Sequence, residues 1–226
     1  MKRLLALLLF TGLATAPAFG DSVTFLGGYV LPRGDSDVYK QNEKETTFRV
    51  SDLNGFGGTI RYDKFIGEFI NISGGVSFFD SHTHVQDVEF VQDHGQPILR
   101  DIFLEIVPLE ASLHVLPAGR NTVIIPYLGG GFGLYYWQYE EHGDFVIDRL
   151  SNNPQVITGR AYSDGWDPGY HIEGGVHVPV GRSVAVVGEA KYWHAHGKLD
   201  VRGFDPSFQP LDLSGMMYSG GVSVWF

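Results

Sequence analysis

The sequence predicts an all-β chain, an eight-stranded antiparallel up-and-down transmembrane β-barrel. Apolar and polar residues alternate in one segment after another, as they do in strands that have one apolar and one polar face. The gaps between these segments are alternately short and long, which is typical of barrels with tight turns at one end and long loops at the other. The alternation continues to the last residue, Phe226.

The last segment predicts a strand with one face toward lipid. Its even-numbered residues are apolar or aromatic and include Tyr218, Val222, Val224 and Phe226. A soluble domain rarely ends on exposed aromatic residues, because chain ends fray and apolar ends aggregate. A strand whose apolar face contacts lipid does not have this problem.

Eight alternating segments are expected to form the strands. They span residues 23–31, 53–62, 69–79, 98–115, 123–139, 170–180, 183–196 and 213–226. Short turns are expected at 63–66, 117–121 and 181–182, and long loops at 32–46, 81–97, 140–167 and 197–212. Pro108 cannot donate a ladder hydrogen bond, so we expect a β-bulge near it in the fourth strand.

Residues 1–20 predict a signal peptide, and residues 21–226 predict the barrel domain. Lys2 and Arg3 precede a short apolar stretch from Leu4 to Phe10, which small residues follow. This order is typical of a secretory signal, and the apolar stretch is too short to cross a bilayer as a helix. We therefore expect export and cleavage.

Composition excludes several kinds of protein. The chain has 16 Lys and Arg against 26 Asp and Glu, a net charge of −10, which argues against nucleic-acid binding because that needs a basic surface. It has no cysteine, so disulfides and thiolate metal sites are excluded. No later segment stays apolar over the roughly 18 residues of a transmembrane helix. A membrane chain without such helices must close into a barrel to satisfy its backbone.

Charged residues and histidines at inward positions predict a polar network in the lumen. They are Arg61, Glu110, His114, His171, Glu173, His177, Glu189 and Lys191. An eight-stranded barrel has room for little besides side chains, so salt bridges and water are expected to fill it. Glu173, Glu189 and Lys191, on neighbouring strands, are the expected centre of this network. The alternative is a gate or a polar conduit.

Aromatic residues near the strand ends predict two interfacial girdles. On the loop side they are Phe78, Phe79, Tyr135 to Trp137, Tyr170, Tyr192 and Trp193, and on the turn side Tyr62, Trp225 and Phe226.

Several stretches resemble the small eight-stranded outer-membrane proteins of the OmpA/OmpX/OmpW type. Residues 109–117 with 126–133 are similar to their central hairpin, residues 56–63 to their second strand, and Trp225-Phe226 to their closing strand. The resemblance implies a bacterial outer-membrane protein in contact with lipids and lipopolysaccharide. It also implies that Tyr218, Val222, Val224 and Phe226 form the signal read by the outer-membrane assembly machinery.

The resemblance leaves the activity open, because this fold hosts adhesins, channels, stress proteins and enzymes. We expect a non-enzymatic protein with a structural or surface-interaction role through four long extracellular loops whose ligand is unknown. The alternatives are a narrow channel for small or apolar solutes and a lipid A-modifying enzyme.

No catalytic residue, cofactor or metal site is expected. Lipid A deacylases use a His and a Ser two residues apart on a late strand. The comparable residues here are His194 and His196, so a histidine stands where the Ser nucleophile would be. His82 and His84 form a second His-x-His pair. Each pair offers two metal ligands, and the sequence fixes no third ligand.

Overall fold

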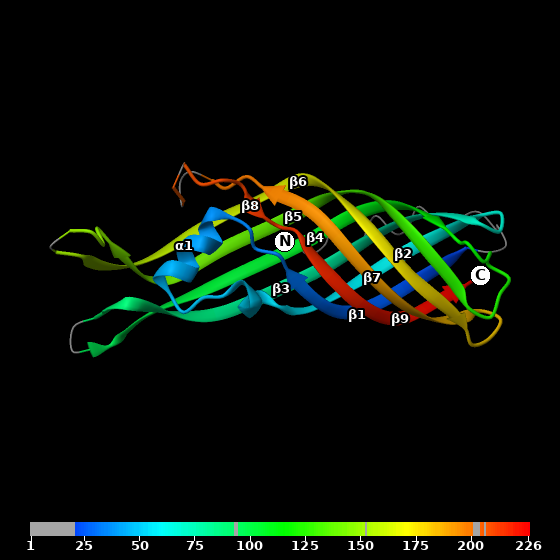
Figure 1. Cartoon of the computed structure of the whole chain (residues 1–226), viewed down its shortest axis with the longest axis horizontal. Coiled ribbons are helices and arrows are strands. Elements are labelled where there is room, and N and C mark those ends of the chain that lie inside the picture. Colours follow the sequence, from blue (N-terminus) through cyan, green and yellow to red (C-terminus); the bar gives the residue numbers. More distant parts are fainter. Residues whose placement is uncertain (1–20, 93–94, 152, 201–203, 206) are drawn as a thin grey trace, which may run out of the picture.

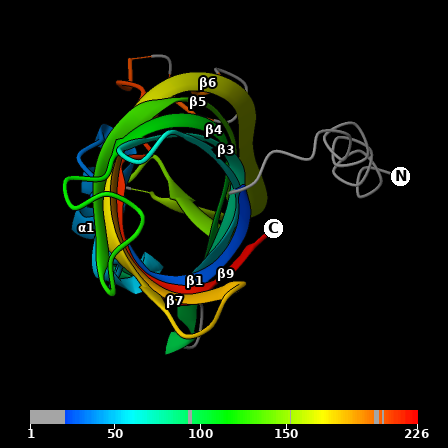
Figure 2. The same ribbon diagram turned by 90° about the vertical axis from the view of Figure 1, so that its right-hand side faces the viewer.

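The computed structural model describes residues 21–226 except 93–94, 152, 201–203 and 206, so the expected signal peptide lies outside the described residues. The described residues form a closed antiparallel ring of eight strands (Figures 1 and 2). The strands are β1 (Ser22–Pro32), β2 (Gly55–Ile66), β3 (Ile70–Val91), β4 (Pro97–Val115), β5 (Ile125–Ile147), β6 (Gln155–Pro179), β7 (Val184–Gly197) and β9 (Gly215–Trp225). The two-residue strand β8 (Leu211–Asp212) pairs with the end of β7.

The ring closes where β1 pairs with β9. The ladder runs from Ser22 opposite Trp225 to Pro32 opposite Gly215, and the hydroxyls of Thr24 and Ser223 are hydrogen-bonded at 3.0 Å. Closure leaves no sheet edge facing lipid, which a membrane-spanning sheet requires. The prediction of an eight-stranded barrel is confirmed.

The two faces of the strands differ as predicted. On β5, Leu128 and Phe132 point outward and are 67% and 78% exposed, whereas Tyr127 and Tyr135 point inward and are buried. On β9, the even-numbered residues are exposed and Met217 is buried. The apolar face is therefore outside, as lipid requires. Among the described residues, no helix has the length and apolar character needed to cross a membrane.

Two of the expected loops are mostly strand. β3 continues past Phe79 to Val91, and β6 begins at Gln155 rather than at Tyr170. The segments 81–97 and 140–167 therefore belong largely to β-hairpins that project beyond the ring (Figure 1). The sequence pattern missed them because both faces carry polar residues there, so the alternation fades while the backbone pairing continues.

Two local predictions were wrong. β2 runs through Asp63 to Ile66, and the turn follows at 67–69, because Gly67 adopts a positive φ of 72°. No bulge occurs at Pro108, since the β3–β4 register is the same on both sides of it and shifts only between Gln86 and Val91. The missing N–H of Pro108 interrupts the ladder without adding a residue.

The first long loop contains two helical segments that were not predicted. They are α1 (Asp37–Glu45) and the 3-10 helix η2 (Val50–Leu53), where the second strand was expected to begin. Asp37 in the first turn and Lys44 in the last turn suit the dipole of α1. The buried ring of Tyr39 packs against Phe48 and against Tyr139 of β5, which places α1 at the loop-side end of the barrel (Figure 1). We call α1 and η2 the loop-side cap.

The interior is built in three layers. Toward the loops lies a large apolar cluster that includes Tyr39, Ile102 and Trp137. Toward the turns lies a smaller one that includes Leu116 and Ile125. Polar side chains occupy the space between them. The expectation of a polar interior therefore holds for the middle layer but not for the two apolar clusters.

The prediction of two aromatic girdles was partly wrong. Phe79, Tyr135, Trp137 and Trp193 are buried in the interior, because neighbouring residues on a strand point to opposite faces. Phe78 and Tyr170 are 55% and 47% exposed on the outside, as predicted. Trp166, in a segment expected to be loop, joins them at 55% exposure.

We predict that Gly129→Ala destabilises the barrel and that Gly27→Ala does not. A Cβ at Gly129 would lie 2.1 Å from His114 Cδ2 and 2.5 Å from the Leu113 carbonyl oxygen, whereas one at Gly27 meets nothing within 4 Å. The measurement is the temperature at which the compact unboiled form is lost on a gel. Equal temperatures for the two variants would contradict the close packing at Gly129.

Candidate functional site

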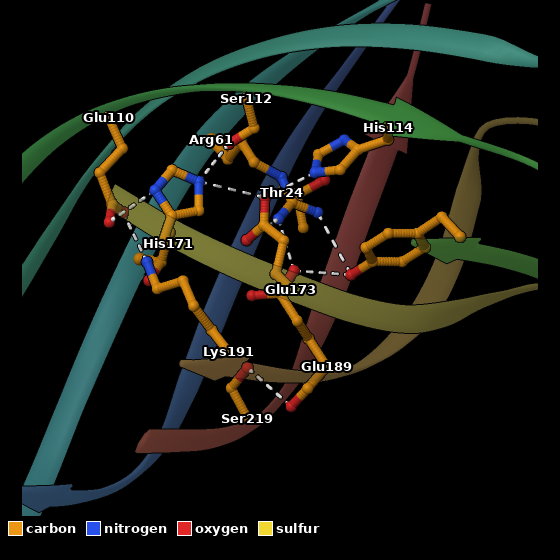
Figure 3. Close-up of polar contacts among 12 residues, drawn as sticks. Thr24, Arg61, Glu110, Ser112, His114, His171, Glu173, Glu189, Lys191 and Ser219 are labelled. Atoms are coloured by element: carbon orange, nitrogen blue, oxygen red, sulfur yellow. Dashed lines mark hydrogen bonds and ion pairs between the residues drawn. The ribbon is translucent and has the colours of Figure 1, made fainter. Parts of the chain in front are cut away.

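The middle layer of the interior forms a connected polar cluster, which we call the lumen network (Figure 3). All eight residues predicted for it point into the barrel with buried side chains. They are Arg61, Glu110, His114, His171, Glu173, His177, Glu189 and Lys191. The network also includes Asp63, Asn71, Ser77, Ser112 and Tyr127.

Arg61 is the centre of the lumen network. Its Nε lies 3.1 Å from Asp63 Oδ1, and its Nη1 lies 3.4 Å from Glu173 Oε2. The same Nη1 contacts Glu189. Asp63 is two residues further along β2, whereas Glu173 and Glu189 belong to β6 and β7. One guanidinium therefore joins three carboxylates from three strands, which suits its fan of donors.

Lys191 is the second cation of the network. Its Nζ lies 2.5 Å from Glu110 Oε2 and donates to Ser77 Oγ at 3.2 Å. Glu110 also accepts from the Tyr135 hydroxyl at 2.8 Å, and His171 Nδ1 lies 3.4 Å from it. The expected centre of Glu173, Glu189 and Lys191 is thus divided, with the two glutamates at Arg61 and the lysine at Glu110.

His114 has a polar partner at each of its ring nitrogens. Nδ1 lies 2.8 Å from Asn71 Oδ1, and Nε2 lies 2.5 Å from Glu173 Oε1. The Asn71 amide nitrogen donates to Asp63 Oδ1 at 3.4 Å, so its oxygen faces His114. Both ring nitrogens of His114 therefore have polar partners, and the ring connects Asn71 of β3 to Glu173 of β6.

His177 is the predicted residue that the salt bridges leave out. Its Nδ1 has no hydrogen-bond partner in the part of the chain that the structure describes. Its ring packs beside Tyr127, at 5.0 Å between centroids, and beside Trp225, at 6.4 Å. His177 therefore lies where the polar layer meets the turn-side apolar cluster.

Sequence reasoning did not assign Tyr127 and Asn71 to the network, although alternation places both inward. The Tyr127 hydroxyl donates to Glu189 Oε2 at 2.6 Å. Its ring also packs against that of His114 at 5.2 Å. Alternation shows that such a residue points inward, but it does not show which group the hydroxyl or amide reaches.

A second polar cluster fixes the loop-side cap to the barrel wall. The buried Asn42 of α1 donates to Glu141 Oε1 at 2.7 Å and accepts from Arg100 Nη1 at 3.0 Å. Arg100 and Glu141 pair at 2.9 Å across β4 and β5. The nearby Tyr39 is fully buried, and this burial, followed by the charges of Asp212 and Glu141, raises the pKa of its phenol above the usual range.

The residues expected to signal assembly all lie on the lipid side. Tyr218, Val222 and Val224 point outward from β9, and Phe226 follows the strand with 64% exposure. Their use as an assembly signal stays a prediction.

Comparison with known proteins gives the fold. No family model and no curated protein matches the sequence. Among solved structures, Neisserial surface protein A has a TM-score of 0.50 and 14% identity over 91% of this chain and 97% of its own. Ail of Yersinia pestis has a TM-score of 0.47 and 12% identity over 91% and 99%, and a major outer-membrane protein of Thermus thermophilus has 0.45 and 12% over 92% and 100%. The chain has the fold of the small eight-stranded outer-membrane β-barrels.

We predict that Arg61→Met lowers the free energy of unfolding by about 3–5 kcal/mol, because it leaves buried carboxylates without their cation. The matched control is Arg160→Met, which removes an exposed pair with Glu140 and should have no measurable effect. Urea unfolding in detergent, followed by tryptophan fluorescence, measures both. A loss no larger for Arg61→Met than for the control would show that the lumen network does not support the barrel.

Proposed function

We propose that this chain is a non-enzymatic protein of the bacterial outer membrane whose closed barrel presents a binding surface at its loop end. In this proposal the apolar outer face contacts lipid and lipopolysaccharide, and the β9 residues Tyr218, Val222, Val224 and Phe226 serve the assembly machinery. The observation that carries the proposal is the filled interior.

The layered interior favours a closed barrel rather than a conduit. Arg61, Glu173 and Glu189 occupy the middle of the lumen, and each is at most 7% exposed. An apolar cluster lies on either side of this layer. An aqueous path would have to pass both clusters and separate buried ion pairs, which is costly.

The loop end has the organisation of a recognition surface. The β5–β6 ladder is continuous out to Ile147 opposite Gln155, so the projecting hairpin has a defined shape. At its tip, Arg149 lies 3.2 Å from Glu45 of α1 and 3.6 Å from Glu89 of β3, and it also contacts Asp87. Arg149 thus connects both hairpins to the loop-side cap. Binding sites are commonly built on such surfaces held by a rigid scaffold.

The chemistry of this surface favours a cationic partner. A hollow of about 610 Å³ lies between α1 and the hairpin tips and is lined in part by Lys44, Glu45, Glu89 and Arg149. Leu150 beside it is fully exposed. Segment 140–167 carries six acidic residues against two arginines, so its field attracts positive charge.

The enzyme alternative has one feature to weigh. The Ser214 hydroxyl lies 2.9 Å from His194 Nδ1, which brings a potential nucleophile to a histidine. Ser214 is only 1% exposed, however, and its Oγ also faces the Ala195 carbonyl oxygen at 3.5 Å. A hydroxyl enclosed in this way does not present itself to a lipid ester.

We predict that the purified protein produces no steady conductance in planar bilayers, because its lumen is filled. A general porin inserted in the same bilayers is the positive control. Discrete current steps from the wild-type protein that change in Glu189→Gln would instead establish the channel alternative. Mass spectrometry of lipid A from cells with and without the protein should show identical species, and a lost acyl chain would establish the enzyme.

We predict that outer-membrane vesicles carrying the protein bind immobilised cationic proteins, but not neutral or anionic ones, through the hairpin tips. Replacing residues 144–157 by a short Gly-Ser turn should abolish this binding while the barrel still assembles. The matched control replaces Gly181-Arg182 at the opposite end and should bind like the wild type. Binding that persists without the tip, or no binding by the wild type, would contradict the proposed surface.

A further inference from the structure

Three potential metal ligands converge on the outer face of the β3–β4 hairpin. His82 and His84 are two residues apart on β3 and therefore share a face. Asp101 of β4 is directly opposite His84, and Phe103 is opposite His82. The sequence offered two histidines without a third fixed ligand, and the strand pairing supplies Asp101 from 17 residues further along the chain.

The geometry of the three groups fits one ion. Their ligand atoms all lie within 4.8 Å of one another. His82 Nε2 is 3.7 Å from Asp101 Oδ1, and His84 Nδ1 contacts the same oxygen. Ligands about 2.1 Å from a tetrahedral ion stand roughly 3.4 Å apart. If the side chains of His84 and Asp101 move slightly apart, the ion therefore fits between them without a change in the backbone.

The ligands are held in place and remain open to solvent. The ring of His82 stacks on Phe103 with 4.2 Å between centroids and 8° between planes, which limits its rotation. The side chains of His82, His84 and Asp101 are 40%, 75% and 35% exposed, so an ion can reach them. Asp80 and Glu105, paired on the same face nearer the barrel, add negative charge.

We propose that His82, His84 and Asp101 form a binding site for a divalent transition metal of the zinc class. Two imidazoles and one carboxylate suit zinc and its neighbours, whereas magnesium and calcium prefer oxygen ligands alone. Three protein ligands leave a coordination position for water or an external donor. The bound ion would join β3 to β4 beyond the apolar band of the barrel.

The second His-x-His pair provides an internal control. His194 and His196 have the same spacing on β7, and His196 Nδ1 lies 3.7 Å from Asp212 Oδ1. His194 Nδ1, however, is engaged by the Ser214 hydroxyl at 2.9 Å. Among the described residues, only the first pair converges with a carboxylate on one point.

We predict that the detergent-folded protein, prepared without a polyhistidine tag, binds one zinc ion per chain in calorimetric titration. His84→Ala and Asp101→Asn should each weaken binding by at least about tenfold, in the range seen when the support of a metal site is removed. The double variant His194→Ala/His196→Ala should bind like the wild type. His84 and His196 are exposed and Asp101 and His194 are partly exposed, so folding, checked by gel mobility, should not change.

Cobalt binding gives a second measurement that does not rely on the heat of binding. Adding Co²⁺ to the wild type should produce visible absorption bands of a nitrogen- and oxygen-coordinated ion, and zinc should displace them. The bands should be missing in His82→Ala/His84→Ala. No zinc binding by the wild type, or equal binding by that double variant, would overturn the proposal.

Discussion

The contact between Arg61 and its three carboxylates is the interaction on which the interior depends. It joins β2 to β6 and β7 through the lumen, so walls that share no backbone hydrogen bonds are held by one side chain. A buried carboxylate without a counter-ion is costly. Removing Arg61 would therefore leave Asp63, Glu173 and Glu189 without the cation that they share.

The layers on either side of this network give the two ends of the molecule different structures. Apolar packing and the loop-side cap isolate the ions from the outside, where Asn42, Arg100 and Glu141 fix α1 to the wall. The interior is packed with side chains like a protein core. Both the proposed binding surface around Arg149 and the proposed metal ligands His82 and His84 lie on the projecting hairpins.

The sequence predicted what depends on alternation and missed what depends on register. Alternation placed Arg61, Glu173 and Lys191 inward and Tyr218 outward. A strand with lipid on one side can turn only its apolar face toward that side, so the direction of every side chain follows. It did not predict α1, whose buried Val38, Tyr39 and Asn42 look like ordinary loop residues until the wall they pack on is known. It also did not bring Asp101 to His84, since cross-strand partners are set by hairpin register, which extends through segments without an apolar face.

The seam between β1 and β9 has a consequence for how the chain reaches this structure. The hydrogen bond between Thr24 and Ser223 joins residues 199 positions apart, whereas the hairpins elsewhere join residues close in sequence. Entropy opposes closure of so long a segment, and topologies dominated by distant contacts fold slowly. Hairpin formation can therefore precede the pairing of the first strand with the last, and that pairing is the closure with the largest entropic cost.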